Sequence, residues 1–592
     1  MNYKGGRKLC YLNSFYCDTK FGKSQNGKFY IARKDFIQMN IKDCDTGETI
    51  LKYIQEPTIE FYVTKNRNNR YPKMSMPITE LNKVECKYKD RDKVASEHLG
   101  ILKEYYDACR MGREIDNYGN SIDYKRKFVQ EFLNNSPHLY QFDMNVEDFY
   151  KNKFMDKNGR DVYNRFGVIN HGMMDIEVDQ NFKEWNAMEY TAPINSISIV
   201  FKYTGEEYLL VLKNQKSKDM DDVIENFDKF VDEYITPHTH TNKIVFKGLF
   251  YETEKELLEG FWNLIHIKKP DFVGIWNMNF DIKYILNRMV KLDMDLENTC
   301  CHPDVPSEFR IVKYIEDGER RKIGNGTHPS RFWDWVHISG YTQFYDMMAL
   351  YSLLRKRYLL PSYKLDDISE SETGYGKLDY SKYGYDIKHL AHQNFKIFLS
   401  YSAIDTLRLL QIEENTDDLN KSMIFCDNTR YEKSQKISHV IKNKMYRIYK
   451  DRRPEEVIGN NVSYNIYANV DGAIIASPNN MMKKGIGILN SEGYIYEDVV
   501  DFDEASEYPR VILSFNISKN SLRGRFFKLV EKDEDDNIIK CYEGDYVYDF
   551  NKHLQTLDSS IFYIGQKYFG LPSVFEIINN IENNNKVCKS NR

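Results

Sequence analysis

Acidic and apolar residues alternate over residues 173–179, whose sequence is Met-Met-Asp-Ile-Glu-Val-Asp. Successive side chains of a β-strand point to opposite faces, so Asp175 and Glu177 would share one face while the apolar residues pack against a core. Two neighbouring carboxylates repel each other unless a cation lies between them, and divalent ions such as Mg²⁺ prefer oxygen ligands. The pattern predicts a metal site if the fold brings further acids to this strand, and an exposed strand face otherwise.

A second candidate acid follows a short apolar strand and opens a helix. Residues 272–276 are mostly apolar, and a polar turn leads from them to Asp281. After this residue apolar side chains recur at the i, i+3, i+4, i+7 spacing that predicts an amphipathic helix. Asp281 is therefore expected in the first turn of a helix that leaves the C-terminal end of a strand. An ordinary first-turn acid, favoured by the helix dipole, would look the same.

A third candidate pair lies in residues 401–410, which are predicted to be helical. Tyr401 and Asp405 are one helical turn apart and share a face. A carboxylate in this position can hold a metal ion, and a phenol one turn away can orient the water bound to it. An exposed helix face is the alternative interpretation.

The elements around these acids indicate a mixed α/β sheet. Strand-like runs at 194–201 and 208–212 follow the first acidic strand, and a turn at 204–207 separates them. Three consecutive strands joined by short turns predict an antiparallel meander. This order fits the opening of a ribonuclease-H-like α/β sheet, with the acidic pair on its first strand.

The N-terminal region mixes strand and helix signals, which predicts an α+β domain. Strand-like runs occur at 28–31 and 58–63, and helical stretches near 96–110 and 124–134. Between them lies a loop, residues 65–71, in which basic residues alternate with Asn and end on Tyr. It could hold single-stranded nucleic acid by charge and stacking, or be a solvated loop.

The bulk properties exclude several classes of protein. A chain of 592 residues is too long for one core, so about three or four domains are expected. The formal net charge of −5 means that any contact with nucleic acid must use local basic grooves. The ten cysteines are scattered and are interpreted as reduced thiols of an intracellular protein. No apolar run approaches the roughly 20 residues that a membrane span requires.

The three acidic segments occur as Asp-x-Glu on a strand, Asn-x-x-Phe-Asp at a strand-to-helix turn, and Tyr-x-x-x-Asp on a helix. In this order they resemble the three exonuclease motifs of a DEDD-class 3′→5′ proofreading domain, with tyrosine in the third motif. The resemblance implies phosphodiester hydrolysis by two metal ions, Mg²⁺ or Mn²⁺. It makes Asp175, Glu177, Asp281 and Asp405 the metal ligands and Tyr401 the residue that orients the attacking water.

Two stretches between the second and third motifs extend the resemblance. Residues 361–378 resemble the segment before the third motif in replicative polymerases of tailed phages. Residues 309–315 and 332–336 are rich in aromatic side chains and could form a β-hairpin. Such a hairpin could hold template and primer strands apart, or its aromatic residues could simply pack in a core.

A later segment, residues 499–510, resembles motif A of family B DNA polymerases. The resemblance makes Asp503 a metal ligand, and Ser506 and Tyr508 contacts of the incoming dNTP. A strand that delivers a carboxylate, followed by a turn that opens a helix, would also present free N–H groups to a triphosphate. The segment departs from the motif at two positions, Glu507 in place of Leu and Arg510 in place of Ser.

We therefore predict an α/β multidomain protein. Its parts are an N-terminal α+β domain over 1–165 with a returning segment at about 421–459, a ribonuclease-H-like exonuclease domain over 166–420, and an incomplete polymerase palm over 460–592. No segment resembles the fingers motif or motif C, which would carry the second palm carboxylate. Polymerisation is accordingly expected to need a C-terminal polymerase chain supplied in trans.

The predicted function is that of the N-terminal part of a family B DNA polymerase with proofreading exonuclease activity. Its expected partners are a DNA primer-template, a single-stranded 3′ end, dNTP and the completing chain, but no membrane. The expected location is the cytoplasm, that of the host cell if the protein is viral. A stand-alone 3′→5′ exonuclease and a non-catalytic nucleic-acid-binding or regulatory protein are the alternatives.

Overall fold

The computed structural model describes residues 9–25, 28–67, 75–115, 121–158, 169–182, 186, 189–213, 217–240, 244–316, 329, 334–355, 360, 362–384, 386–426, 446, 450–460, 524–532 and 538–550. The contacts between residues divide the chain into two compact units, Met1–Ala468 and Asn469–Arg592. The division into three domains at 165 and 420–460 stays a prediction.

A six-stranded sheet in the first unit has the order β13-β12-β11-β10-β14-β17. Its strands are β10 (His171–Val178), β11 (Ile194–Phe201), β12 (Glu206–Leu212), β13 (Val245–Tyr251), β14 (Phe272–Ile275) and β17 (Gln343–Asp346). The first three form the predicted antiparallel meander, although β12 begins two residues earlier than expected. The strands β10, β14 and β17 run parallel to one another, so the residues that follow their C-terminal ends meet at one edge of the sheet.

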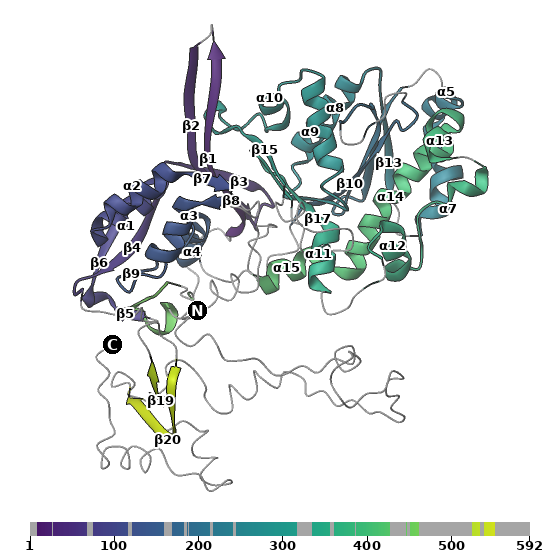
Figure 1. Cartoon of the computed structure of the whole chain (residues 1–592). Coiled ribbons are helices and arrows are strands. Elements are labelled where there is room, and N and C mark those ends of the chain that lie inside the picture. The colour runs from purple at the N-terminus through teal and green to yellow at the C-terminus, as the bar shows by residue number, and fades with distance from the viewer. Residues whose placement is uncertain are drawn as a thin grey trace, which may run out of the picture. The chain divides into compact units, whose positions relative to one another are not determined.

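Helices cover both faces of this sheet (Figure 1). Met174, Ile176 and Val178 of β10 pack in one apolar core together with α8 (Glu254–Lys268) and α9 (Asp281–Lys291). The opposite face packs against α14 (Phe395–Thr416) in a second core. Because both faces are covered, all eight residues of β11 are buried, including the polar Asn195, Ser196 and Ser198.

The helix α14 is fastened to the sheet by hydroxyl groups as well as by apolar contacts. The Ser198 hydroxyl of β11 donates to the Ser402 carbonyl oxygen at 3.1 Å, and the hydroxyls of Ser196 and Ser402 are 3.1 Å apart. Small side chains at these positions let the helix approach the strand closely. The face of β10 that carries the acidic pair therefore lies under the middle of α14.

The N-terminal region has the predicted mixture of strands and helices. Its strands are β1 (Leu9–Gln25), β2 (Lys28–Asp43), β3 (Thr49–Gln55), β4 (Thr58–Thr64), β6 (Leu81–Lys87) and β9 (Leu139–Tyr140), and its helices include α1 (Arg91–Leu99), α2 (Leu102–Met111), α3 (Tyr124–Phe128) and α4 (Val146–Asn158). The single helix expected near 96–110 is two helices, because Gly100 has φ 76° and ends α1 in the left-handed conformation. Further along the chain, β18 (Glu456–Ile458) returns to pair with β5 (Ser75–Pro77).

A buried ion pair joins β2 to the start of β14 and, through the same carboxylate, to the start of β10. Lys42 donates to the Asp271 carboxylate at 2.6 Å, and the side chains are 4% and 0% exposed. The same carboxylate accepts from the Thr49 hydroxyl at 2.5 Å and from the Asn170 backbone N–H at 2.8 Å. Asp271 precedes β14 and Asn170 precedes β10, so one carboxylate connects both strands to the N-terminal sheet.

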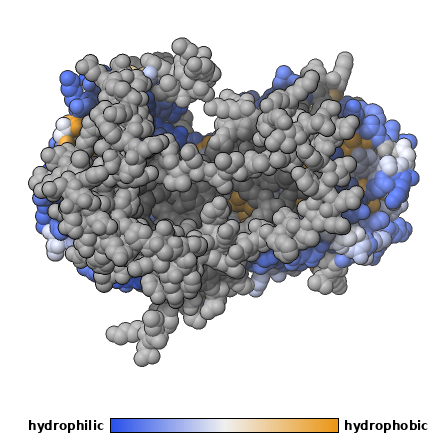
Figure 2. Space-filling model, turned by 60° about the horizontal axis from the view of Figure 1, so that its bottom comes forward, coloured by the Kyte–Doolittle hydropathy of each residue, from blue (hydrophilic) through white to orange (hydrophobic). Residues whose placement is uncertain are grey.

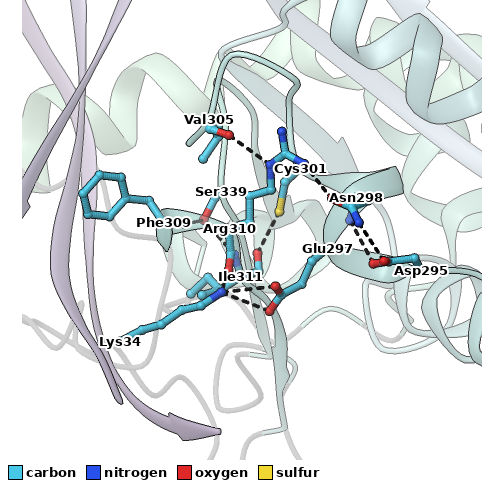
Figure 3. Close-up of polar contacts among 10 residues, drawn as sticks. All are labelled: Lys34, Asp295, Glu297, Asn298, Cys301, Val305, Phe309, Arg310, Ile311 and Ser339. Atoms are coloured by element: carbon cyan, nitrogen blue, oxygen red, sulfur yellow. Dashed lines mark hydrogen bonds and ion pairs between the residues drawn. The ribbon is translucent and has the colours of Figure 1, made fainter. Parts of the chain in front are cut away.

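Further contacts join the N-terminal sheet to residues 297–310 (Figure 3). Lys34 of β2 donates to the carboxylate of Glu297 at 3.1 Å and to the carbonyl oxygen of Arg310. The rings of Tyr53 and Phe309 are stacked, with centroids 4.7 Å apart. Directly after Arg310 the chain enters the hairpin of β15 (Val312–Ile315) and β16 (Trp335–Ile338), which is antiparallel as predicted. A role of this hairpin in strand separation stays a prediction.

In the second unit the structure describes β19 (Gly524–Lys532) and β20 (Ile538–Phe550), which pair as an antiparallel hairpin. The predicted palm residues Asp503, Ser506 and Tyr508 lie outside the described residues. Among the helices that the structure describes, none is long and apolar enough to span a lipid bilayer. In the face shown in Figure 2 the coloured surface is mainly hydrophilic.

We expect Lys42→Met to lower the free energy of unfolding by about 3–5 kcal/mol, because it leaves the Asp271 carboxylate buried without a cation. Adding Asp271→Asn should restore most of the loss, since the amide oxygen can replace Oδ2 and accept from the Asn170 N–H while the amide NH₂ group donates to the Thr49 hydroxyl oxygen. Urea denaturation measures both. Lys83→Met, which breaks an exposed pair with Glu60, is the matched control and should change stability by less than about 1 kcal/mol. An undiminished stability of Lys42→Met would contradict this role of the pair.

Candidate active site

Three carboxylates from distant parts of the sequence converge between β10 and α14. Asp175 and Glu177 project from β10 and Asp405 from α14, and each offers an oxygen within 4.8 Å of the others. The alternation of β10 turns the acids away from the core that contains α8 and α9, and the close packing of α14 brings Asp405 over them. The arrangement has the ligand type and spacing of a divalent-cation site.

Asp281 lies next to this group without being part of the set of three. It occupies the first turn of α9, as predicted, and is 4% exposed. Burial raises the pKa of its carboxyl well above the usual value, and the charges of Asp175 and Glu177 raise it further. The turn before it is held by Asp346, the last residue of β17, whose carboxylate accepts from the Met278 N–H at 3.2 Å. Asp281 thus lies within the field of the acidic pair.

The negative charge of the clustered carboxylates exceeds the positive charge that surrounds them. Burial, and next the charge of Asp405, raise the pKa of Asp175 from 3.8 to about 7. Burial and the charges of its neighbours hold the pKa of Glu177 well above its usual value. The buried Oδ1 atom of Asp405 has no hydrogen-bond partner. Buried oxygens that are crowded and unpaired in this way fit a divalent cation, which would favour their charged forms.

The cluster also contains a cation that sequence reasoning missed. Lys377 forms an ion pair with Asp405 and donates to the Tyr401 hydroxyl at 3.1 Å. Burial lowers the pKa of this lysine, but the charges of Asp405 and Asp175 outweigh it and raise the pKa above its usual value. A lone lysine in a loop has no periodicity that predicts such a role, and the available signals were the glycines at 374 and 376 and the resemblance of residues 361–378 to the segment before the third motif.

The loop that carries Lys377 is fixed from two sides. The Asp366 carboxylate accepts from the Lys377 backbone N–H at 2.6 Å. Arg408, three residues beyond Asp405 on α14, donates to the Gly376 carbonyl oxygen at 2.7 Å. Tyr401 meanwhile contacts the ring of Tyr380 edge-on, with centroids 5.4 Å apart. The phenol, the lysine and the third-motif carboxylate are therefore held as one group.

Half-buried carboxylates on a strand and a buried one on a helix, with a phenol and a lysine beside them at the edge of a mixed sheet, have the composition of a metal-dependent phosphoryl-transfer site. Residues 119–368 match the family model of the DNA polymerase family B exonuclease domain. This match supports a family B DNA polymerase exonuclease region in this segment. The matched residues include Asp175, Glu177 and Asp281, whereas Tyr401 and Asp405 lie beyond them.

Individual relatives give the same result. The chain is 27% identical over 294 residues to the DNA-directed DNA polymerase of Escherichia phage RB69, covering 49% of this chain and 28% of that protein. It is 23% identical over 279 residues to that of Enterobacteria phage T4, covering 47% and 27%. DNA polymerase 120R of Invertebrate iridescent virus 3 is 24% identical over 291 residues, covering 45% and 23%. The chain thus spans about a quarter of the length of these curated relatives.

We expect Mg²⁺ or Mn²⁺ to raise the melting temperature, and to raise it more above pH 7 than below. The folded Asp175 has a pKa of about 7 against 3.8 ordinarily, so it keeps a proton that the unfolded chain has lost. Without metal, stability therefore falls as pH rises between these values, and a bound cation replaces the proton.

Differential scanning fluorimetry in chelator and in Mn²⁺ measures the increment in melting temperature that the metal ion causes. The double variant Asp175→Asn and Glu177→Gln should lose it. Asp367→Asn with Glu370→Gln, an exposed acidic pair on α12 (Leu365–Thr373), removes the same charge elsewhere and should keep it. An increment that is equal in all three proteins would argue against a metal at the cluster.

Proposed function

We propose that this chain is a 3′→5′ exonuclease that hydrolyses DNA with divalent metal ions and that it proofreads for a family B DNA polymerase. The observation that carries the proposal is the convergence of Asp175, Glu177 and Asp405 with Tyr401 one helical turn away. The sheet order, with an antiparallel meander followed by parallel strands, supports a ribonuclease-H-like fold for this region.

In this proposal Asp175, Glu177, Asp281 and Asp405 hold two metal ions. Bound ions supply an activated water and neutralise the leaving 3′ oxygen. The Tyr401 hydroxyl orients the attacking water, and burial raises its pKa, so it remains a neutral hydrogen-bond donor. Lys377 holds this hydroxyl and the Asp405 carboxylate in position by contacting both. Its charge compensates part of the negative charge that a phosphodiester brings into the site.

We expect the double variant Asp175→Ala and Glu177→Ala to lose several orders of magnitude in the rate of single-stranded DNA degradation, because it removes both strand ligands. The assay is release of nucleotides from the 3′ end of a labelled oligonucleotide in Mg²⁺. The exposed pair Asp367→Ala and Glu370→Ala is the matched control and should degrade DNA like the wild type. Undiminished hydrolysis by the first variant would rule out the assignment.

We further propose that the protein takes part in DNA polymerisation on a primer-template with dNTP. The relatives are named DNA-directed DNA polymerases, and residues 499–510 resemble polymerase motif A. Asp503 would be a metal ligand there, and Ser506 and Tyr508 would contact the nucleotide. We propose that the second palm carboxylate comes from a polymerase part that carries motif C, which no segment of residues 1–592 resembles.

We expect the 592-residue chain to extend a primer only when a polypeptide with the fingers motif and motif C is added. Asp503→Asn should abolish extension by the mixture and leave exonuclease activity intact, because the two sites use different carboxylates. Gel assays of both reactions on one labelled primer separate the two activities. Primer extension by the chain alone would overturn this part of the proposal and leave the exonuclease untouched. A stand-alone exonuclease would show no extension in either case.

A further inference from the structure

Two exposed aromatic rings stack beside the loop that carries Lys377. The ring centroids of His240 and Tyr375 are 3.9 Å apart, and the interplanar angle is 3°. His240 follows α7 (Thr236–Thr239), and Tyr375 lies two residues before Lys377 in the sequence. Tyr375 is 43% exposed, so the contact contributes little to an apolar core. The stack therefore calls for another explanation than core packing.

The backbone on both sides of the stack is unusual. His240 has a φ of 49°, a left-handed conformation that residues with a side chain adopt infrequently. Tyr375 lies between Gly374, whose φ is 79°, and Gly376, where a Cβ atom would be 2.6 Å from Asp366 Oδ1. Because glycines flank it on both sides, the chain at Tyr375 has wide conformational freedom. The contacts of the Tyr375 ring consequently help to decide where this loop lies.

Arg408 of α14 joins the two segments that the stack connects. Its Nε donates to the Gly376 carbonyl oxygen at 2.7 Å, and its Nη2 donates to the His238 carbonyl oxygen at 3.0 Å. Its Cζ also lies 5.7 Å from the centroid of the Tyr375 ring. Both α7 and α12 contact α14 (Figure 1). The stack thus completes a closed set of contacts on the helix that carries Asp405.

The loop ends at the one cation described within the carboxylate cluster. The Lys377 ammonium pairs with the Asp405 carboxylate and donates to the Tyr401 hydroxyl at 3.1 Å. A lysine has a flexible four-carbon stem, so its backbone must be fixed if the ammonium is to keep both contacts. A displacement of about 1 Å in a group that positions reacting atoms can cost much of a reaction rate.

We propose that His240 and Tyr375 are positioning residues of the exonuclease site. Their stack fixes residues 374–377 against α14, and this loop holds the Lys377 ammonium on Asp405 and Tyr401. The rings act through Lys377 and not by contact with DNA. The inference rests on the proposed exonuclease function, and it makes the segment between β12 and β13 part of what sets the rate.

The first test is kinetic. His240→Asn and Tyr375→Leu each remove one ring, and asparagine tolerates the left-handed backbone at position 240. Each should lower kcat for the degradation of single-stranded DNA by about three- to tenfold and leave KM within about twofold, because the variants misplace catalytic groups without removing a DNA contact. Tyr375→Phe keeps the stack and should keep the rate. His98→Asn, which changes an exposed histidine of α1, is the matched control.

The Lys377→Met background shows whether the rings act through the lysine. In that background His240→Asn should cause no further loss of rate, because the group that the stack positions is already absent. Rings that stacked on a base of the substrate would instead raise KM, and they would do so with and without the lysine.

Reductive methylation in chelator, followed by mass spectrometry, measures the environment of Lys377 without any nuclease reaction. The Lys377 ammonium is paired and its side chain is 28% exposed, so methylation should be slow in the wild type. It should become at least about threefold faster in His240→Asn and in Tyr375→Leu, and stay slow in Tyr375→Phe. Lys127 of α3, whose side chain is 56% exposed, is the internal reference and should react equally in all variants.

Unchanged methylation of Lys377 in both ring-removing variants would overturn the proposal. A loss of rate that keeps its full size in the Lys377→Met background would overturn it as well. If the wild-type chain shows no nuclease activity while the ring-removing variants expose Lys377 as expected, the proposed function fails and the positioning of Lys377 by the stack is supported.

Discussion

Electrostatic repulsion among crowded, partly or fully buried carboxylates is the constraint on which the exonuclease region depends. Asp175, Glu177 and Asp405 lie within 4.8 Å of one another, and the described cation among them is Lys377. One lysine cannot balance three carboxylates, so their pKa values rise and the site retains protons unless metal ions replace them. The repulsion among these carboxylates destabilises the folded chain, and the same repulsion would give the site its affinity for cations.

At the N-terminal ends of β10 and β14, by contrast, the charge of a buried carboxylate is neutralised. Asp271 is fully buried, and its carboxylate is saturated by Lys42, Thr49 and the Asn170 N–H. It connects the first residues of β10 and β14 to the N-terminal sheet. The parallel strands are thus anchored at their N-terminal ends by a neutralised carboxylate and carry unneutralised carboxylates at or beyond their C-terminal ends. This polarity places the reactive groups at the edge where parallel strands end.

Local patterns allowed much of this to be predicted. Alternation identified β10 and the face that carries Asp175 and Glu177, and the apolar stripe identified α9 with Asp281 in its first turn. Short-range periodicity reports which side of an element faces a core, and these elements obey it. Where a single residue overrides the pattern the prediction was less accurate, as at Gly100, which divides the predicted N-terminal helix into α1 and α2.

The sequence by itself determined the identity of the acids, the elements that carry them and the direction in which each side chain points, because strand and helix periods are local properties. Only the tertiary structure decided which groups meet. Lys377 reaches Asp405 because Arg408 and Asp366 fix its loop. Asp271 meets Lys42 through a contact between segments that are distant along the chain. Such contacts depend on packing, which no spacing along the chain encodes.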